Sequence, residues 1–481
     1  PAGMHKKGTL IDIHEWDTGK YLGQIAQARQ TYNVIGNMNE FQLTIGETTF
    51  GGRPELVDTT GIIDYGSLIY LGLQRSRTAR EAIKVMTELV QEYGYYSGGE
   101  SFTIADPNEI WIMEMIGKGP GVRGAVWVAV RVPDDCISAH ANQSRIHQFN
   151  MNDKENCMYS PDVISFAREK GYFDGVNKDF SFADAYAPLD FGARRYCEAR
   201  VWSYFNMFTD RGNEFLPYIL GETDTPMPLF VKPNRKVSVQ DVKNAMRDHY
   251  EGTPLDISKD FGAGPYHTPY RLSPLSFKVG DREYFNERPI STQQSGFVFV
   301  AQMRSELPDP IGGVLWFGTD DANMTVFTPV YCCTDKVPVC YTRVDGADYI
   351  TFSWNSAFWI FNWVANMVYP RYDLMMGDVR ATQTELETTF NEAQEGVEAA
   401  AAKLLEKDPA KAKAFLTNYT NMTAQSTFDT WKRLGEFLVV KYNDGVVKRM
   451  KNGQFERNSI GQPAGVIRPG YPKEFLEEYV K

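Results

Sequence analysis

The longest regular pattern of apolar positions lies between Ser101 and His140, where four β-prone runs follow one another. The first run ends at residues 106–108, Asp-Pro-Asn, and the second ends in a Gly/Pro cluster at residues 117–124. Proline presets φ and asparagine bonds its own backbone, so both favour turns. The third run is AVWVAVRV, and the fourth starts at Cys136. The spacing predicts a β-meander whose runs are too continuous for a sheet with one face in water, so we expect layers on both sides.

Two hairpin-like segments and two helices are predicted before the meander. Alternating apolar residues surround Asp17-Thr18-Gly19, which indicates a hairpin, and a second pair of strands flanks residues 37–41. The first helix is expected over about residues 63–74. The second begins at Thr78, where a capping box with Glu81 satisfies amides of the first turn, and it ends at Gly94.

Helical patterns follow the meander. Ser160-Pro161 has the form of an N-cap followed by proline at the first helical position, with Gly171 as the stop. Further helices are expected over about residues 193–208 and 238–252. Residues 253–295 show little periodicity, strands resume at residue 296, and the part from 353 to 481 is mainly helical.

The order of elements is strands, helices, strands and helices, which predicts an α+β fold. The simplest arrangement with this order is two mostly antiparallel sheets packed together, with layers of helices outside them. Neither a repeat nor a low-complexity linker divides the chain. We therefore predict a single domain over residues 1–481, with 353–481 as its mainly helical C-terminal part.

Composition excludes some classes of protein. The 481 residues are 43% hydrophobic and 23% charged, which is ordinary for a globular protein, and the formal charge of −11 argues against nucleic-acid or anionic-membrane binding. The most apolar stretch, residues 352–370, is interrupted by Ser and Asn, so it predicts a buried helix and no membrane span.

Six cysteines fit no zinc or haem pattern. Cys332, Cys333 and Cys340 allow a short-loop disulfide in an oxidising compartment, which would favour a periplasmic or secreted protein; buried thiols are the plainer alternative.

The candidate chemistry lies in polar residues at strand ends. Familiar nucleophile, phosphate-loop and metalloprotease motifs are absent, and the six histidines are scattered, so no metal and no cofactor are expected. The remaining candidates end or begin a predicted strand or stand in a helix: Glu47, Thr48, Thr49, Glu100, Asn142 and Arg200. Each also has a structural alternative, as a turn residue, a solvated strand end or an ion-paired arginine.

Several of these segments, taken together, resemble a known family. NMNEFQLTIGETTFGG, GESFTIADPNEIWIMEMIGKG, SAHANQSRI and MRDHYEGT are similar to the cysteine dipeptidases related to dipeptidase A. These are N-terminal-nucleophile (Ntn) hydrolases, related to choloylglycine hydrolase and penicillin V acylase. The resemblance covers most of the chain and implies an αββα four-layer sandwich, dipeptide substrates, and an N-terminal cysteine whose own α-amino group serves as the base. The pKa of such an amine, about 8, suits proton transfer near neutral pH.

The resemblance also implies roles for particular residues. Asn142 would help to bind the tetrahedral oxyanion, and Arg200 would fix the electrostatics around the thiolate. Thr48 would supply a second oxyanion donor through its backbone or its hydroxyl group. From charge alone, Glu47 is a candidate partner for the free ammonium group of the substrate, in an acid-lined pocket that includes Glu100.

The sequence departs from this family at its start. Pro1 is not the expected cysteine, so we expect the nucleophile to lie upstream of Pro1 and this chain alone to be inactive. The partners implied are dipeptides and the segment that carries the nucleophile, and the sequence leaves a monomer or a homo-oligomer open. Two alternatives remain: an amide hydrolase of the same fold that acts on N-acyl amino acids, and a non-catalytic binding relative.

Overall fold

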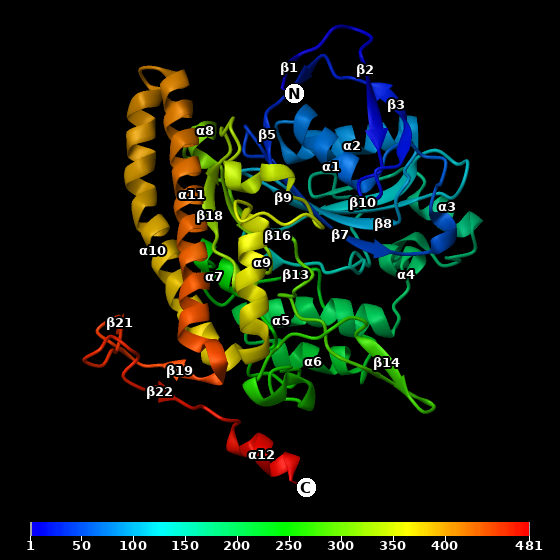
Figure 1. The fold of residues 1–481 in the computed structure, drawn as a ribbon. Coiled ribbons are helices and arrows are strands. Elements are labelled where there is room, and N and C mark those ends of the chain that lie inside the picture. The colour runs from blue at the N-terminus through cyan, green and yellow to red at the C-terminus, as the bar shows by residue number, and fades with distance from the viewer. Residues whose placement is uncertain (1, 481) are drawn as a thin grey trace. The chain divides into compact units, whose positions relative to one another are not determined.

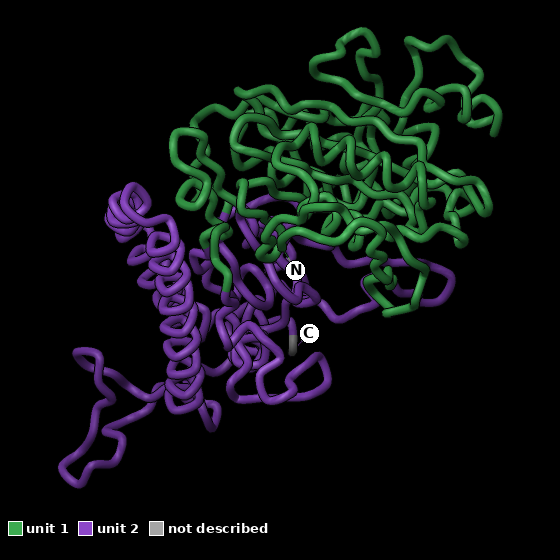
Figure 2. The backbone as a smooth tube through the Cα atoms, turned by 90° about the horizontal axis from the view of Figure 1, so that it is seen from above, with its two compact units in different colours: residues 1–242, 301–315, 331–335 green, residues 243–300, 316–330, 336–481 purple. Residues whose placement is uncertain are grey.

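The computed structural model describes residues 2–480, so Pro1 lies outside the described part. The backbone divides into two compact units (Figure 2). Unit 1 contains residues 1–242, 301–315 and 331–335, and unit 2 contains residues 243–300, 316–330 and 336–481. Helices and strands occur together, as an α+β fold requires. The four-layer αββα sandwich stays a prediction.

Unit 1 is built on a seven-stranded antiparallel sheet in the order β12-β10-β9-β8-β7-β6-β5. Successive side chains of a strand point to opposite faces. Met113 accordingly packs with helices α1 and α2 on one face, whereas its neighbour Ile112 packs with α3 and α4 on the other. The predicted meander, formed by β8, β9 and β10, and its burial on both faces are confirmed (Figure 1). The elements of the sheet and its helices are β5 Val34–Ile35, β6 Met38–Asn39, β7 Thr44–Gly51, α1 Tyr65–Arg75, α2 Ala79–Tyr93, β8 Gly99–Ala105, β9 Ile110–Gly117, β10 Ala125–Arg131, β12 Cys157–Tyr159, α3 Val163–Glu169 and α4 Phe182–Tyr186.

The other elements of the N-terminal part are short strands and two helices. The hairpin predicted around Asp17 is the pair β2–β3. Helix α5 is preceded by a turn of π-helix at Ala193–Glu198, and the helix predicted over 238–252 is the shorter α7. These elements are β1 Gly3–Met4, β2 Leu10–His14, β3 Tyr21–Ala26, β4 Gln30–Thr31, β11 Ile137–Ser138, α5 Ala199–Phe208, α6 Gly212–Leu220, β13 Phe230–Val231 and α7 Val239–Ala245.

Two details of the prediction are wrong. The run that starts at Cys136 is not the fourth strand of the meander: its strand β11 pairs with β13, and β10 pairs with β12 instead. Ser160 is not an N-cap, because its Oγ accepts a hydrogen bond from Trp127 N at 3.2 Å and α3 begins only at Val163. In both cases a partner distant in sequence decides the local structure.

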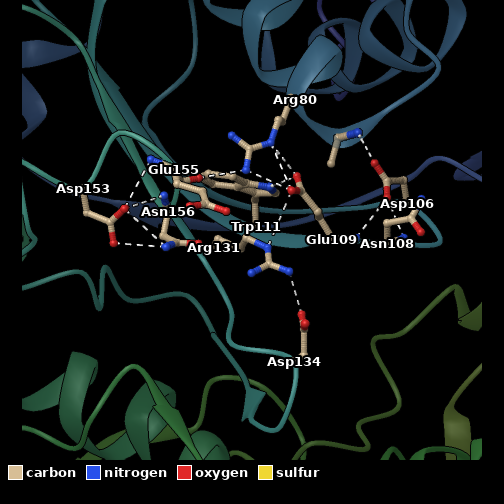
Figure 3. A network of polar contacts seen from close by, with 11 residues as sticks. Arg80, Asp106, Asn108, Glu109, Trp111, Arg131, Asp134, Asp153, Glu155 and Asn156 are labelled. Carbon is tan, nitrogen blue, oxygen red and sulfur yellow. Dashed lines mark hydrogen bonds and ion pairs between the residues drawn. The ribbon is translucent and has the colours of Figure 1, made fainter.

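Helix α2 and the β8–β9 turn are joined by a polar network (Figure 3). Asp106 Oδ1 accepts from Glu109 N at 3.0 Å inside the turn, and Asp106 Oδ2 accepts from Ala79 N, the first residue of α2, at 2.8 Å. The Arg80 guanidinium lies over the Trp111 ring, 4.8 Å from its centroid, and donates to the carboxylate of Glu109. This network fixes the start of α2 against the meander.

Unit 2 contains three long helices, α9 (Ala357–Val368), α10 (Tyr372–Leu405) and α11 (Pro409–Tyr442). Helices α10 and α11 lie side by side (Figure 1), and Phe361 of α9 stacks on Trp431 of α11 with 4.8 Å between ring centroids. Arg247 Nη2 and Glu387 Oε1 of α10 form an ion pair at 2.5 Å in which both side chains are buried. The buried helix predicted within 352–370 is α9.

The remaining elements are three strands of a sheet and several small pieces. The strand order of that sheet is β16-β17-β18. No helix within residues 2–480 is long and apolar enough to cross a membrane. These elements are β14 Ser276–Val279, β15 Arg282–Phe285, β16 Phe297–Gln302, α8 Asp309–Gly312, β17 Val314–Thr319, β18 Thr328–Tyr331, β19 Val447–Lys448, β20 Met450–Lys451, β21 Gln454–Phe455, β22 Val466–Ile467 and α12 Lys473–Tyr479.

Candidate active site

Two glutamates predicted as substrate ligands lie on neighbouring strands of unit 1. In the β7–β8 ladder Thr49 is opposite Glu100, and Glu47 is two residues before Thr49. Side chains two apart on a strand share a face, so all three face the same side of the sheet. Thr49 Oγ1 donates to Glu100 Oε1 at 2.8 Å, and the carboxyl groups of Glu47 and Glu100 are close enough for each to affect the pKa of the other. The structure therefore brings Glu47, Thr49 and Glu100 together.

The carboxyl groups of Glu47 and Glu100, called the acid pair below, cannot both be fully ionised. Burial, together with the neighbouring charge of Glu47, raises the pKa of Glu100 to about 10, and burial also raises the pKa of Glu47. Asp17, on the turn of the β2–β3 hairpin, adds a further negative charge nearby and accepts a hydrogen bond from Tyr65 Oη at 2.9 Å. A proton shared between close carboxylates is the normal result of such crowding. At neutral pH Glu100 is therefore protonated, and Glu47 and Asp17 are the groups of the site that can carry a negative charge toward a cationic ligand.

Asn142 is held in an uncommon conformation beside the end of β7. Its φ is 59°, in the left-handed region that asparagine tolerates better than most residues. Its Nδ2 donates to the carbonyl oxygen of Thr49 at 2.7 Å, and its Oδ1 accepts from Arg200 Nη2 at 3.0 Å. Arg200 Nη2 also donates to Ala141 O at 3.1 Å. The two residues that the sequence analysis paired through chemistry are thus in direct contact, and Arg200 fixes which end of the Asn142 amide donates.

The residues after Asn142 are tied to buried partners, which explains why the loop keeps its shape. Gln143 Nε2 donates to Ala187 O at 2.8 Å, and Ser144 Oγ donates to the buried Glu114 at 2.5 Å. Arg145 forms a buried ion pair with Glu198 at 2.9 Å. Because the residues that follow it are held in place, the Asn142 side chain is preorganised. An oxyanion donor requires such preorganisation.

Thr48 lies on the opposite face of the sheet from Glu47. Its hydroxyl group is within 2.6 Å of His140 Nδ1, and the other ring nitrogen of His140 lies 2.7 Å from Thr103 Oγ1. Burial lowers the pKa of His140 to about 4, so the ring is neutral at pH 7. The Thr48 side chain is therefore engaged away from the two glutamates, and its backbone remains the group available to a substrate.

Beyond Ile45, β7 has one free edge within residues 2–480. Strand β6 pairs with it only at Thr44, so the edge opposite β8 has no ladder partner from residue 46 to residue 51. The register shifts between Thr49 and Gly51, as in a β-bulge, which re-aims a strand and is common near active sites. A ligand at this edge can reach side chains of both faces.

A cavity of about 440 Å³ opens beside Asn142. Its lining includes Arg53, just after β7, and Cys197, in the π-turn before Arg200. Gly52 is required between β7 and Arg53, since a Cβ there would lie 2.8 Å from Tyr186 O and 2.7 Å from Ile116 Cδ1.

Sequence reasoning missed three participants: His140, Arg53 and Cys197. His140 was visible two residues before Asn142, but its threonine partners are on other strands. Arg53 carried no local signal, because its side-chain hydrogen bond and ring contact are with Ala185 and Tyr172, more than a hundred residues away. All six cysteines have free thiols, so the short-loop disulfide considered for Cys332, Cys333 and Cys340 is not formed. The described residues contain no cluster that would hold a metal ion.

Comparison with known proteins identifies the family of this chain. The sequence model of peptidase family C69 matches residues 1–385, so the chain belongs to that family. It is similar to a probable dipeptidase of Salmonella dublin, with 30% identity over 326 residues that cover 66% of this chain and 65% of the relative. It is also similar to a probable dipeptidase of Latilactobacillus sakei (27% identity over 352 residues, 73% and 66%) and to dipeptidase A of Lactobacillus helveticus (24% over 320 residues, 66% and 60%). The chain thus spans slightly less than two thirds of the length of these relatives.

Proposed function

We propose that this protein is a dipeptidase whose reaction centre lies at the open edge of β7, beside Asn142. The observation that carries the proposal is the contact of Asn142 with Arg200 next to a buried acid pair. Membership of peptidase family C69 and the names of the similar proteins support the same activity.

In the proposed reaction the nucleophile is the thiolate of an N-terminal cysteine, outside residues 2–480. The thiolate attacks the peptide carbonyl carbon, and the α-amino group that took the thiol proton passes it to the leaving amine as the C–N bond breaks. Water then attacks the thioester, which releases the first amino acid and restores the thiol.

Asn142 Nδ2 stabilises the oxyanion of the tetrahedral intermediate, and the Thr48 backbone is the second candidate donor. Arg200 holds the Asn142 amide with its NH₂ group toward the reaction centre and adds positive charge near the thiolate. One preorganised donor of this kind contributes about 2.7–4 kcal/mol in the transition state. The chain's residues thus orient the substrate and stabilise its charge, while the cysteine supplies the covalent chemistry.

The acid pair selects the substrate. Glu47 and Glu100, whose pKa values are raised by burial, bind the free ammonium group that every dipeptide carries. N-acylation removes that positive charge, so an N-acetylated dipeptide is expected to be a poor substrate. Efficient hydrolysis of N-acyl amino acids would instead support the related amide-hydrolase function.

The test uses the full-length protein from its natural source. We expect hydrolysis of a dipeptide panel, and we expect iodoacetamide to stop it by alkylating an N-terminal cysteine, identified by peptide mapping. Cys197→Ser is the informative variant, because Cys197 lines the same cavity. Retained activity supports the N-terminal nucleophile, whereas loss of activity with alkylation mapped to Cys197 would assign the nucleophile to this thiol. Absence of dipeptide hydrolysis would favour a binding protein.

A further inference from the structure

We propose that Arg53 anchors the free carboxylate of the substrate. This inference rests on the proposed function and extends it from the ammonium end of the dipeptide to the opposite end. Arg53 follows β7 directly, after Gly51 and Gly52, and lines the cavity that also contains Asn142.

The guanidinium of Arg53 is fixed on one side and free on the other. Its Nε donates to Ala185 O at 2.7 Å, and its central carbon lies 3.9 Å from the centroid of the Tyr172 ring. These two contacts set the plane of the group. Nη1 and Nη2 have no hydrogen-bond acceptor among residues 2–480. A planar guanidinium with both terminal nitrogens free suits the bidentate recognition of a carboxylate.

Three charged residues line the cavity. Arg53 is the only cationic residue among the described residues that line it, and Glu55 and Asp190 are the acidic ones. Glu55 Oε1 accepts from Tyr172 Oη at 2.8 Å, and Asp190 Oδ1 accepts from Ala193 N at 2.7 Å. Hydrogen bonds from the Glu55 backbone and from Tyr172, together with the charge of Arg53, lower the pKa of Glu55. No ion pair within 4.0 Å joins Arg53 to either carboxylate among residues 2–480.

The order of groups along β7 matches the order of groups in a dipeptide. Glu47 comes first, Thr49 holds Asn142 next, and Arg53 follows the strand. A dipeptide presents an ammonium group, one scissile amide and a carboxylate in the same order. An anchor at Arg53 would therefore recognise the C-terminal end of the substrate, since a C-terminal amide lacks the negative charge.

The test compares a dipeptide with its C-terminal amide on the full-length protein. We expect the wild type to show a kcat/KM for the free dipeptide 10- to 100-fold above that for the amide. Arg53→Met should lower the dipeptide value to near that of the amide, mainly through KM, and leave the amide value unchanged. Arg53→Lys should give an intermediate value, because lysine keeps the charge and loses the bidentate geometry.

Arg168→Met is the matched control. Arg168 also lies over an aromatic ring, that of Phe173, and donates to a backbone carbonyl, that of Gly175, but it does not line the cavity. It should leave both kcat/KM values unchanged. An Arg53→Met effect that is equal for dipeptide and amide, or no effect at all, would overturn the inference while dipeptidase activity stands. Wild-type protein inactive on every dipeptide would overturn the proposed function itself, and calorimetric titration of the dipeptide against the wild type and Arg53→Met would still report whether Arg53 binds its carboxylate.

Discussion

At the scale of single residues, Asn142 combines a left-handed backbone with a side chain bound at both ends. Its Oδ1 accepts a hydrogen bond from Arg200, and its Nδ2 donates one to the carbonyl oxygen of Thr49. In the proposed reaction, the oxyanion takes the place of this carbonyl oxygen as acceptor. If Asn142 is the oxyanion donor, Asn142→Gly should lower kcat by about 10²–10³-fold with KM little changed. Glycine keeps the left-handed conformation without strain, so any fall in the thermal midpoint should reflect only the two lost side-chain hydrogen bonds.

Asn142→Ala should lose the same activity and additionally some stability, by about 1–2 kcal/mol, because alanine disfavours a positive φ. The comparison of the two variants, by steady-state kinetics and thermal unfolding, separates the catalytic amide from the backbone requirement. Full activity in Asn142→Gly would exclude Asn142 from the oxyanion site.

Glu100 links the pH dependence of stability to the binding site. Its pKa is raised by burial to about 10 in the folded protein, against about 4.3 in an unfolded chain. The unfolded state therefore releases this proton first as the pH rises, and the stability that the group contributes, complete below about pH 4.3, falls progressively up to its folded pKa.

Glu100→Gln removes this titration and keeps the shape. We expect it to be more stable than the wild type at pH 8, by about 1–3 kcal/mol, and indistinguishable from it near pH 4. Urea unfolding at several pH values measures the difference, with Glu88→Gln, an exposed position on α2, as the control. A difference that does not change with pH would contradict the raised pKa. Affinity for dipeptides should fall in the same variant, which illustrates stability given up for function.

At the scale of elements, the ion pair of Arg247 with Glu387 attaches α10 to the rest of unit 2. Both side chains are buried, and Glu387 Oε1 also accepts from Phe327 N at 3.1 Å. Glu387→Gln leaves the arginine charge buried without its counter-charge and should cost about 3–5 kcal/mol of unfolding free energy.

Denaturant unfolding measures this cost. Glu477→Gln provides the control, since Glu477 pairs with Lys473 on the surface of α12, where such pairs contribute about 0–1 kcal/mol. Equal small effects of the two substitutions would show that water or another group compensates Arg247.

Elements set by local chemistry could be predicted from the sequence. Thr78 caps α2 and accepts from Glu81 N at 3.3 Å, and the helix ends before Gly94 with its φ of 79°. The turn at Asp106 between β8 and β9 is also set by local residues and could be predicted. The strand that pairs with β10 could not be predicted, because β11 and β12 have similar short apolar patterns and only contacts in the folded chain decide between them.

At the scale of the whole molecule, all six cysteines are free thiols and five of them are buried. An unfolded chain of residues 1–481 prepared without reductant should therefore react with six equivalents of a thiol reagent, and dithiothreitol should leave the unfolding midpoint unchanged. A closed disulfide would remove two equivalents and make stability sensitive to reductant, since losing one typically costs about 2–5 kcal/mol.

The candidate site shows where sequence reasoning reaches its limit. Glu47 and Glu100 were predicted at strand ends, but the structure places them inside β7 and β8, where strand alternation puts them on one face of the sheet. Their roles and that of Asn142 stay predictions. The role of Arg53 depends on Tyr172 and Ala185, which approach it only in the fold. A residue whose neighbours are all distant in sequence gives no periodic or motif signal.

The glycine between β7 and Arg53 has a consequence for the evolution of specificity. Any side chain at Gly52 would meet the Tyr186 carbonyl and Ile116, and its φ of 72° also disfavours other residues. No other residue is therefore tolerated at position 52. A single substitution there cannot change the distance between Thr49, which contacts Asn142, and Arg53. Descendants of this protein are expected to explore new substrates through residues that line the cavity, such as Leu189, while the two ends of the binding site stay at a fixed separation.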